Sequence, residues 1–411
     1  FGGIVIAAGH IVLGLEADDS GPMGQGLFWL GLATVVVGTG FLKSSASALV
    51  GQLYPRGDMR TDPAFTIFYM GINVGGLAGP IVCGYLGQAW GWHWGFGAAA
   101  VGMIAGVIGF AFARPLLQGK GEPPDPALLA QKPGGIVSRE ALVYLSSLAA
   151  IVACWFLIQH HDVIGGALAV AGPVMALYLL WQAFGRMEGV GRDRMLAALF
   201  LLAVNPIFWG LYEQTGSSLN LFTDRYADRT LWGIDVPAAV FQSVNSAYIL
   251  IFGPVVAALW IWLAKRGLEP SAPMKFGIAV VLVGAGFLVL VAGAGAPGTL
   301  TPIIMIFLLY FLHTIGELCL SPVGLSAMSK LAPARMIGLM MGVWFLAMAL
   351  GQYVAGLIAA AAGGEGGTGS REDVLSVYGR IGWWSVALGI AVMTAAPLIK
   401  RLMHVDRGDE G

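Results

Sequence analysis

The sequence contains few charged residues. Asp, Glu, Lys and Arg make up 11% of its 411 residues, whereas hydrophobic residues make up 57%. A soluble domain needs about 25% charged residues to cover its surface. The outer face of this chain is therefore expected to meet lipid, and the sequence predicts an integral membrane protein.

Other shortages argue against several classes of function. The net charge is −1, and the basic residues are dispersed among short segments, so nucleic acid is not expected as a partner. The three cysteines, Cys83, Cys154 and Cys319, have no metal-ligand spacing and are interpreted as small buried hydrophobic residues. No metal site or cofactor is expected. The absence of His-Glu-x-x-His and Asp-rich pyrophosphate motifs also argues against an intramembrane enzyme with catalytic residues.

Long apolar runs recur along the whole chain. A helix needs about 20 apolar residues to cross a bilayer core of roughly 30 Å, and runs of this order predict about twelve transmembrane helices. The expected segments are 1–15, which is incomplete, and 27–52, 64–89, 93–113, 141–159, 164–185, 195–217, 237–264, 274–293, 302–329, 336–362 and 377–400. Because the sequence starts inside an apolar run, we expect a truncated start rather than a signal peptide.

The positions of Lys and Arg set the expected orientation. If Phe1 starts on the cytoplasmic side, most of the 22 Lys and Arg residues fall in cytoplasmic connections, as the positive-inside rule requires. The Pro-rich segment 115–140 is then interpreted as a cytoplasmic linker between two membrane lobes. A weak similarity between residues 47–56 and 326–333 also indicates duplicated lobes.

Ionisable residues inside the spans are candidate functional residues. A charge at mid-bilayer costs roughly 2.5–3.5 kcal/mol, so such a residue is expected to face the bundle interior or a wet cavity. Lys43, Glu213 and Glu317 qualify, with a structural ion pair or a snorkelling side chain as the alternative. His313 lies on the same helical face as Glu317, where the two could share a proton, although a packing role is the commoner one for a buried histidine.

Uncharged residues in the spans have simpler explanations. The glycines Gly75 and Gly79 are expected mainly to permit close helix packing. An unpaired amide in a span is costly, so four amides are expected either to bond between helices or to contact a ligand: Asn73, Asn205, Gln214 and Asn245.

Three strings of this sequence are long and specific. The run Phe65–Gly76, FTIFYMGINVGG, resembles the motif on the fifth core helix of the proton-dependent oligopeptide transporter family. Gly316–Ser326, GELCLSPVGLS, is similar to its tenth-helix motif, and Phe208–Gln214, FWGLYEQ, resembles its seventh. The strings occur in family order across nearly the whole chain.

The resemblance implies an all-α integral membrane fold of the major facilitator superfamily. It makes the first span the family's third core helix, so core helices 3 to 12 are expected together with an inserted helical pair. The implied organisation is an amino-terminal lobe at 1–114, a linker at 115–140, the inserted pair at 141–194 and a carboxy-terminal lobe at 195–411. The family's first two core helices and their Glu-x-x-Glu-Arg-Phe-x-Tyr-Tyr motif match no position in this sequence.

The resemblance also implies roles for single residues. Lys43 would bind the peptide carboxylate, and Asn73 would contact the peptide backbone. Glu317 and Asn245 would receive the peptide amino group. The termini of an extended dipeptide are roughly 7 Å apart, so a cation on one lobe and an anion on the other could hold both ends.

The resemblance also assigns residues to proton coupling and to the wall of the peptide pocket. Lys43, Glu213 and Glu317 would take part in proton coupling. Trp209 and Trp344 would line the peptide pocket.

The function that the resemblance implies is proton-coupled symport of di- and tripeptides by alternating access across the inner, cytoplasmic membrane. Its partners would be small peptides, protons and membrane lipid. One alternative is a related carrier of nitrate, an amino acid or another small organic anion, although Glu317 favours an amine-bearing substrate. A non-transporting peptide sensor is another, and the sequence leaves the oligomeric state open.

Overall fold

The chain is helical almost throughout the residues that the structure describes. The structure is a computed structural model, and it describes residues 1–16, 21–53, 61–122, 126–133, 135–363 and 369–404. In these residues eleven helices are long and apolar enough to cross a membrane, and a shorter apolar helix covers Gly2–Leu15. The predicted all-α membrane fold is confirmed, and its incomplete first span is this shorter helix.

The chain divides into two compact units, and each is described by itself. Unit 1 is Phe1–Ile164 and unit 2 is Gly165–Gly411. The helices of unit 1 are α1 Gly2–Glu16, α2 Pro22–Gln52, α3 Thr61–Gly79, α4 Tyr85–Trp90, α5 Trp92–Ala113, α6 Pro126–Ala130 and α7 Arg139–Gln159. Helix α1 packs against α2 and α5, and α7 packs against α2. Of the segment 47–56, which resembles 326–333, residues 54–56 lie outside the described residues.

Proline sets the path of the third span in unit 1. Helix α3 passes through a π-helical turn at Pro80–Gly84 into α4. Pro80 has no backbone N–H, so the regular ladder of hydrogen bonds is interrupted there. The span ends at Gly91, whose φ of 109° is readily adopted only by glycine, and α5 follows directly.

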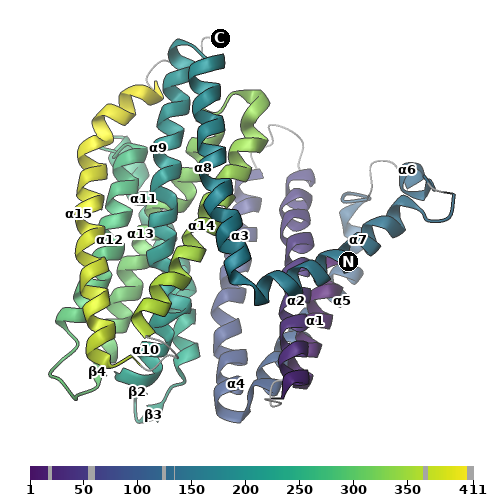
Figure 1. Cartoon of the computed structure of the whole chain (residues 1–411), viewed down its shortest axis with the longest axis horizontal. Helices are drawn as coiled ribbons and strands as arrows, with labels where there is room; N and C mark the ends of the chain where they lie inside the picture. Colours follow the sequence, from purple (N-terminus) through teal and green to yellow (C-terminus); the bar gives the residue numbers. More distant parts are fainter. Residues whose placement is uncertain (17–20, 54–60, 123–125, 134, 364–368, 405–411) are drawn as a thin grey trace. The chain divides into compact units, whose positions relative to one another are not determined.

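Unit 2 is a bundle of long helices (Figure 1). Its helices are α8 His161–Arg186, which begins in unit 1, α9 Gly189–Tyr212, α10 Ser218–Tyr226, α11 Ser243–Ala264, α12 Ala272–Ala292, α13 Ile303–Leu331, α14 Ile337–Gly363 and α15 Arg371–Met403. The short strands β1 Ala227–Asp228 and β4 Thr301–Pro302 pair in parallel, and β2 Thr230–Leu231 pairs antiparallel with β3 Ile234–Asp235. The span expected at 195–217 continues beyond α9 through a 3-10 turn, Glu213–Gly216, into α10.

Paired glycines bring α12 and α15 into close contact. A Cβ atom on Gly284 would lie 2.7 Å from the carbonyl oxygen of Gly382. A Cβ atom on Gly277 would lie 2.9 Å from the carbonyl oxygen of Gly389. The two pairs are about two helical turns apart, so they lie on one face of each helix. Small residues allow such close approach where no hydrophobic effect drives helices together in lipid.

Gly75 and Gly79 do not pack in this way. A Cβ atom on either glycine would have no atom within 4 Å in the described part of the chain. Within the described residues of unit 1, the structure therefore shows no close packing at these two glycines, and the expectation stays a prediction. The expectation that all three cysteines are buried was only partly right, since Cys319 is buried but Cys83 and Cys154 are half-buried.

Arg371 fixes the start of α15 to the segment that follows α12. Its side chain is 7% exposed and donates to the carbonyl oxygen of Ala294 and to Oγ1 of Thr301. Ser370 caps the helix, and its Oγ accepts a hydrogen bond from the backbone N–H of Asp373. This basic side chain is thus part of the buried structure.

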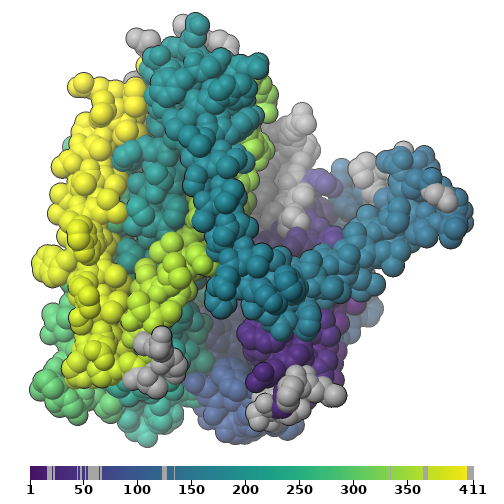
Figure 2. Space-filling view, viewed as in Figure 1, coloured from purple at the N-terminus to yellow at the C-terminus, as the bar shows by residue number. Residues whose placement is uncertain are grey.

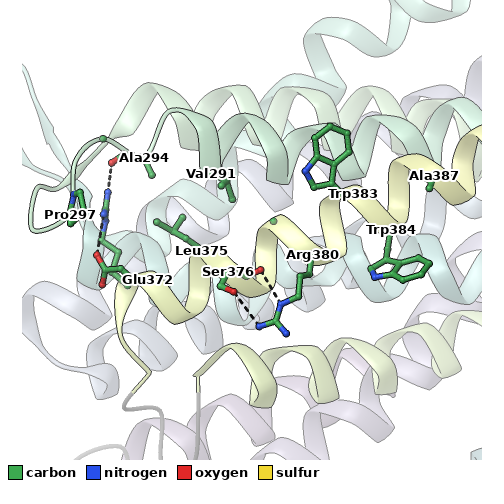
Figure 3. Close-up of a pocket in the computed structure, with 13 residues that line it drawn as sticks. Val291, Ala294, Pro297, Glu372, Leu375, Ser376, Arg380, Trp383, Trp384 and Ala387 are labelled. Carbon is green, nitrogen blue, oxygen red and sulfur yellow. Dashed lines mark hydrogen bonds and ion pairs between the residues drawn. The ribbon is translucent and has the colours of Figure 1, made fainter.

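The outer flank of α15 carries exposed tryptophans. Figure 2 shows α15, in yellow, along one side of unit 2. A surface depression of about 750 Å³ follows this helix, with Arg380, Trp383 and Trp384 in its lining (Figure 3). Arg380 is bonded to its own helix at Ser376, while Trp383 and Trp384 are 65% and 76% exposed. Both tryptophans lie well inside the candidate span Arg371–Met403.

Candidate functional site in unit 2

Glu317 lies on α13, and its carboxylate is held by side chains from two other helices. Tyr212 of α9 donates its hydroxyl to Oε2 at 2.6 Å. Asn245 of α11 donates Nδ2 to the same oxygen at 3.1 Å, and to Oγ1 of Thr314 at 3.0 Å. Three helices therefore fix the position of one carboxylate.

The second oxygen of this carboxylate, Oε1, remains available. No donor from the described residues is bound to Oε1, and the Glu317 side chain is only half-buried. A carboxylate has room for about four hydrogen bonds on its two oxygens. The arrangement can thus accept hydrogen bonds from an ammonium group while Tyr212 and Asn245 hold the carboxylate in place.

The structure brings Glu317 and Asn245 together, and it adds Tyr212, which sequence reasoning missed. Tyr212 precedes Glu213 within the string Phe208–Gln214. Its place in that string was the available signal. A tyrosine in an apolar span is too common to be singled out from its residue type alone.

The two predicted pocket tryptophans occupy different surroundings. Trp209 is 8% exposed, and its ring meets that of Tyr212 edge-on with centroids 5.2 Å apart. Its Nε1 is buried without a partner among the described residues. Trp344 is 2% exposed and packs over Gly324 of α13 and near Phe276 of α12. The peptide-lining role of both residues stays a prediction.

His313 does not share a hydrogen bond with Glu317 in the described structure. Its ring is fully buried, and Nε2 faces the carbonyl oxygen of Val283 on α12 at 3.1 Å. Phe287 packs edge-on against the ring at 5.0 Å. The spacing of four residues places both side chains on one helical face, but the imidazole turns toward α12. The packing explanation of His313 fits the structure, and the proton relay does not.

Glu213 and two buried amides, Asn205 and Gln214, lie near Tyr212 in the sequence, on α9 or in the turn that follows it. Glu213 begins the 3-10 turn after α9, and its Oε1 accepts a bond of 3.4 Å from Nε2 of Gln352 on α14. Gln214 bonds between helices, with Nε2 donating to the carbonyl oxygen of Ala355 at 3.0 Å. Asn205 is fully buried, and neither of its side-chain polar atoms has a described partner.

The predicted residues of unit 1 lie on two of its spans. Lys43 is an exposed residue of α2. Asn73 of α3 is 6% exposed and donates Nδ2 to the carbonyl oxygen of Tyr69 at 3.0 Å. Because the units are described separately, the pairing of Lys43 with Glu317 across a central cavity stays a prediction.

Comparison with known proteins identifies the family. The model of the POT family matches residues 1–363. This chain belongs to the POT family. The fold of this POT family member is that of the major facilitator transporters, as the sequence predicted.

Relatives of this POT family member match nearly the whole of this chain and about four fifths of their own length. "Peptide transporter YePEPT" of Yersinia enterocolitica is 35% identical, with 100% of this chain and 81% of that protein covered. "Dipeptide and tripeptide permease A" of Escherichia coli K12 is 30% identical, with 100% and 80% covered. A crystal structure of a mutant of the peptide transporter POT with alafosfalin has a TM-score of 0.81 at 33% identity, with 98% and 80% covered.

Proposed function

We propose that this chain is a carrier that moves di- and tripeptides together with protons across the cytoplasmic membrane by alternating access, and that it is not an enzyme. The observation that carries the proposal is the Glu317 carboxylate, with one oxygen held by Tyr212 and Asn245 and the other available. The names of the relatives, which describe peptide transporters and dipeptide and tripeptide permeases, support the same substrate class.

The substrate amino group would bind to the available oxygen of Glu317. An ammonium ion is a donor of three hydrogen bonds, and pairing it with a carboxylate in a partly dehydrated site gives a strong, directional contact. Lys43 would receive the peptide carboxylate from the other lobe, and Asn73 would contact the peptide backbone. Trp209 and Trp344 would line the space between the two ends.

A carboxylate that can bind either the ammonium group of a peptide or a proton could couple peptide transport to proton transport. Substrate and proton drive each other only if both shift the same equilibrium between inward-open and outward-open states. Glu213, Glu317 and Lys43 are the groups we assign to this step. The lobes at 1–114 and 195–411, joined by 115–140 and the inserted pair at 141–194, would be the parts that rock.

Uptake of a labelled dipeptide into liposomes tests the proposed function. With the full chain reconstituted, an inward proton gradient is expected to drive dipeptide above its external concentration, and dissipating the gradient should end this accumulation. Competition by unlabelled tripeptide, but not by nitrate or free amino acids, would separate peptide symport from the related carriers. Binding of dipeptide without any flux would instead identify a sensor.

Replacement of Tyr212 by Phe is expected to weaken dipeptide binding roughly tenfold, because a hydrogen bond to a charged group contributes about 1.5 kcal/mol or more. The carboxylate of Glu317 would lose one of the two bonds that orient it. Tyr226→Phe is a matched control, since the Tyr226 hydroxyl donates to the carbonyl oxygen of Gly369 at 2.9 Å, away from Glu317. Dipeptide titration of both variants provides the measurement. Equal dissociation constants would exclude Tyr212 from substrate binding.

A further inference from the structure

A cavity of about 850 Å³ lies at one end of unit 2, where α12 begins and α11, α13 and α15 end. Four basic side chains and one acidic side chain contribute to its lining: Arg194, Lys275, Lys330, Lys400 and Glu269. Glu317 is not part of this lining, so the cavity is separate from the proposed substrate contacts. An excess of positive charge around one cavity raises the local potential and favours an anion.

Lys275 is the buried cation of this cavity. Its side chain is 7% exposed, its Nζ lies 2.5 Å from Oε1 of Glu269, and it is 4.5 Å from the ring centroid of Trp260. Lys275 also lies near the start of α12, where the partial positive charge of the helix N-terminus disfavours a cation. The ion pair and the aromatic face offset this cost, and they hold a positive charge at the cavity wall.

The other three cations leave donors for a ligand. Lys330 and Lys400 are exposed, and neither forms a hydrogen bond or ion pair with another described residue. Arg194 uses Nε to cap α15 at the carbonyl oxygen of Met403, 3.3 Å away. The two terminal nitrogens of its guanidinium group form no hydrogen bond or ion pair with the described residues. The last turns of α13 and α15 are ordinary places for a lysine, but that does not explain why both converge with Lys275 on one cavity.

The apolar part of the lining indicates what kind of anion would fit. Val256 and Ala257 of α11 and Leu318 and Val323 of α13 line the same cavity as the cations. The positive-inside rule places this end of the bundle at the cytoplasmic surface. A soluble anion would use only the charged part of such a cavity. An anionic phospholipid would use both, with its phosphate on the cations and its glycerol and upper acyl chain on the apolar wall.

The geometry points to a binding site for the phosphate of an anionic phospholipid from the cytoplasmic leaflet. The lysines Lys330 and Lys400, being exposed and without other partners, would contact the phosphate. The buried Lys275 would add its positive charge to the electrostatic potential of the cavity. The inference concerns lipid binding and does not depend on the transported substrate.

Native mass spectrometry of the full chain in nanodiscs tests this site. Phosphatidylglycerol is expected to remain bound after release from the disc, whereas phosphatidylcholine is not. The double variant Lys330→Gln, Lys400→Gln is expected to bind phosphatidylglycerol roughly 30-fold more weakly, because each basic residue near the phosphate contributes about a fivefold gain in affinity. The control is Lys120→Gln, Lys265→Gln, which removes two exposed lysines outside the cavity.

The outcomes separate the possible explanations. An equal loss in the cavity and control variants would mean that only net surface charge matters, and it would overturn the site. Undiminished phosphatidylglycerol binding by the cavity variant would do the same. If millimolar inorganic phosphate displaced the lipid from the wild-type chain completely, the cavity would be a site for soluble anions and the lipid assignment would fall. Dipeptide binding measured on the same variants should be unchanged, which would show that the fold is intact.

Discussion

Replacement of Glu317 by Gln is expected to abolish accumulation of dipeptide under an inward proton gradient. Gln keeps the shape of the side chain and still accepts hydrogen bonds from Tyr212 and Asn245, but it carries no charge for the substrate ammonium and cannot take up a proton. Truncating one partner of a buried charge pair typically costs about 2–5 kcal/mol, so dipeptide affinity should fall by a factor of roughly 30 or more.

A matched control separates this effect from a general loss of negative charge. Glu188 is an exposed carboxylate at the N-cap of α9, and its side chain makes no capping hydrogen bond. Glu188→Gln should therefore transport as the wild-type chain does. Uptake into liposomes and dipeptide titration are the two measurements. If the Glu317→Gln protein still concentrated dipeptide, Glu317 could not be the ammonium site, and the proposed coupling would lose its central group.

The polar residues show what local sequence can and cannot predict. A carboxylate inside an apolar run has a high cost in lipid, so Glu317 stood out without any structure. Tyr212 did not, because its importance comes from a contact with a helix about a hundred residues further along the chain. For His313, helical spacing predicted the face shared with Glu317 but not which neighbouring helix the ring would turn toward, and the packing role that the sequence favoured fits the structure.

Lys275 was missed for a related reason. It lies two residues after Pro273 near the start of a span, where the positive-inside rule counts it among the cytoplasmic basic residues but says nothing of its partners. The structure buries it because Glu269 and Trp260 both reach its ammonium group. Neither contact could be inferred from hydropathy, because a window average describes a segment and not the partners of one side chain.

The glycines give the clearest example of this limit. Gly75 lies in a cluster that suggested close helix packing, whereas Gly284 lies in an ordinary apolar run. Among the described residues of unit 1, a Cβ atom on Gly75 would meet nothing within 4 Å, whereas one on Gly284 in unit 2 would meet a carbonyl oxygen of another helix. A glycine permits the close approach of two helices. Whether the helices come close depends on the residues that the neighbouring helix presents at that position.

Replacement of Gly284 by Leu is expected to destabilise unit 2 strongly. The first carbon of the new side chain would lie 2.7 Å from both the carbonyl oxygen of Gly382 and Cβ of Ser385. Backbone cannot move aside as a flexible side chain does, so α15 must shift away from α12. That shift would stretch the 2.7 Å bond from the Ser385 hydroxyl to the carbonyl oxygen of Val280. Overpacking and a weakened buried hydrogen bond together should cost about 3 kcal/mol or more.

Gly356→Leu on α14 is the control, because a Cβ atom there would have no described atom within 4 Å. Replacing a helical glycine by leucine improves helix propensity by roughly 0.8 kcal/mol, so this variant should be as stable as the wild-type chain or slightly more so. Thermal unfolding in detergent is expected to show a Tm lowered by roughly 6–12 °C for Gly284→Leu and unchanged or raised for Gly356→Leu. Equal Tm values for the two variants would mean that α12 and α15 are not held together through their glycines. Since both changes add the same side chain to a membrane helix, any difference between them measures the contact itself.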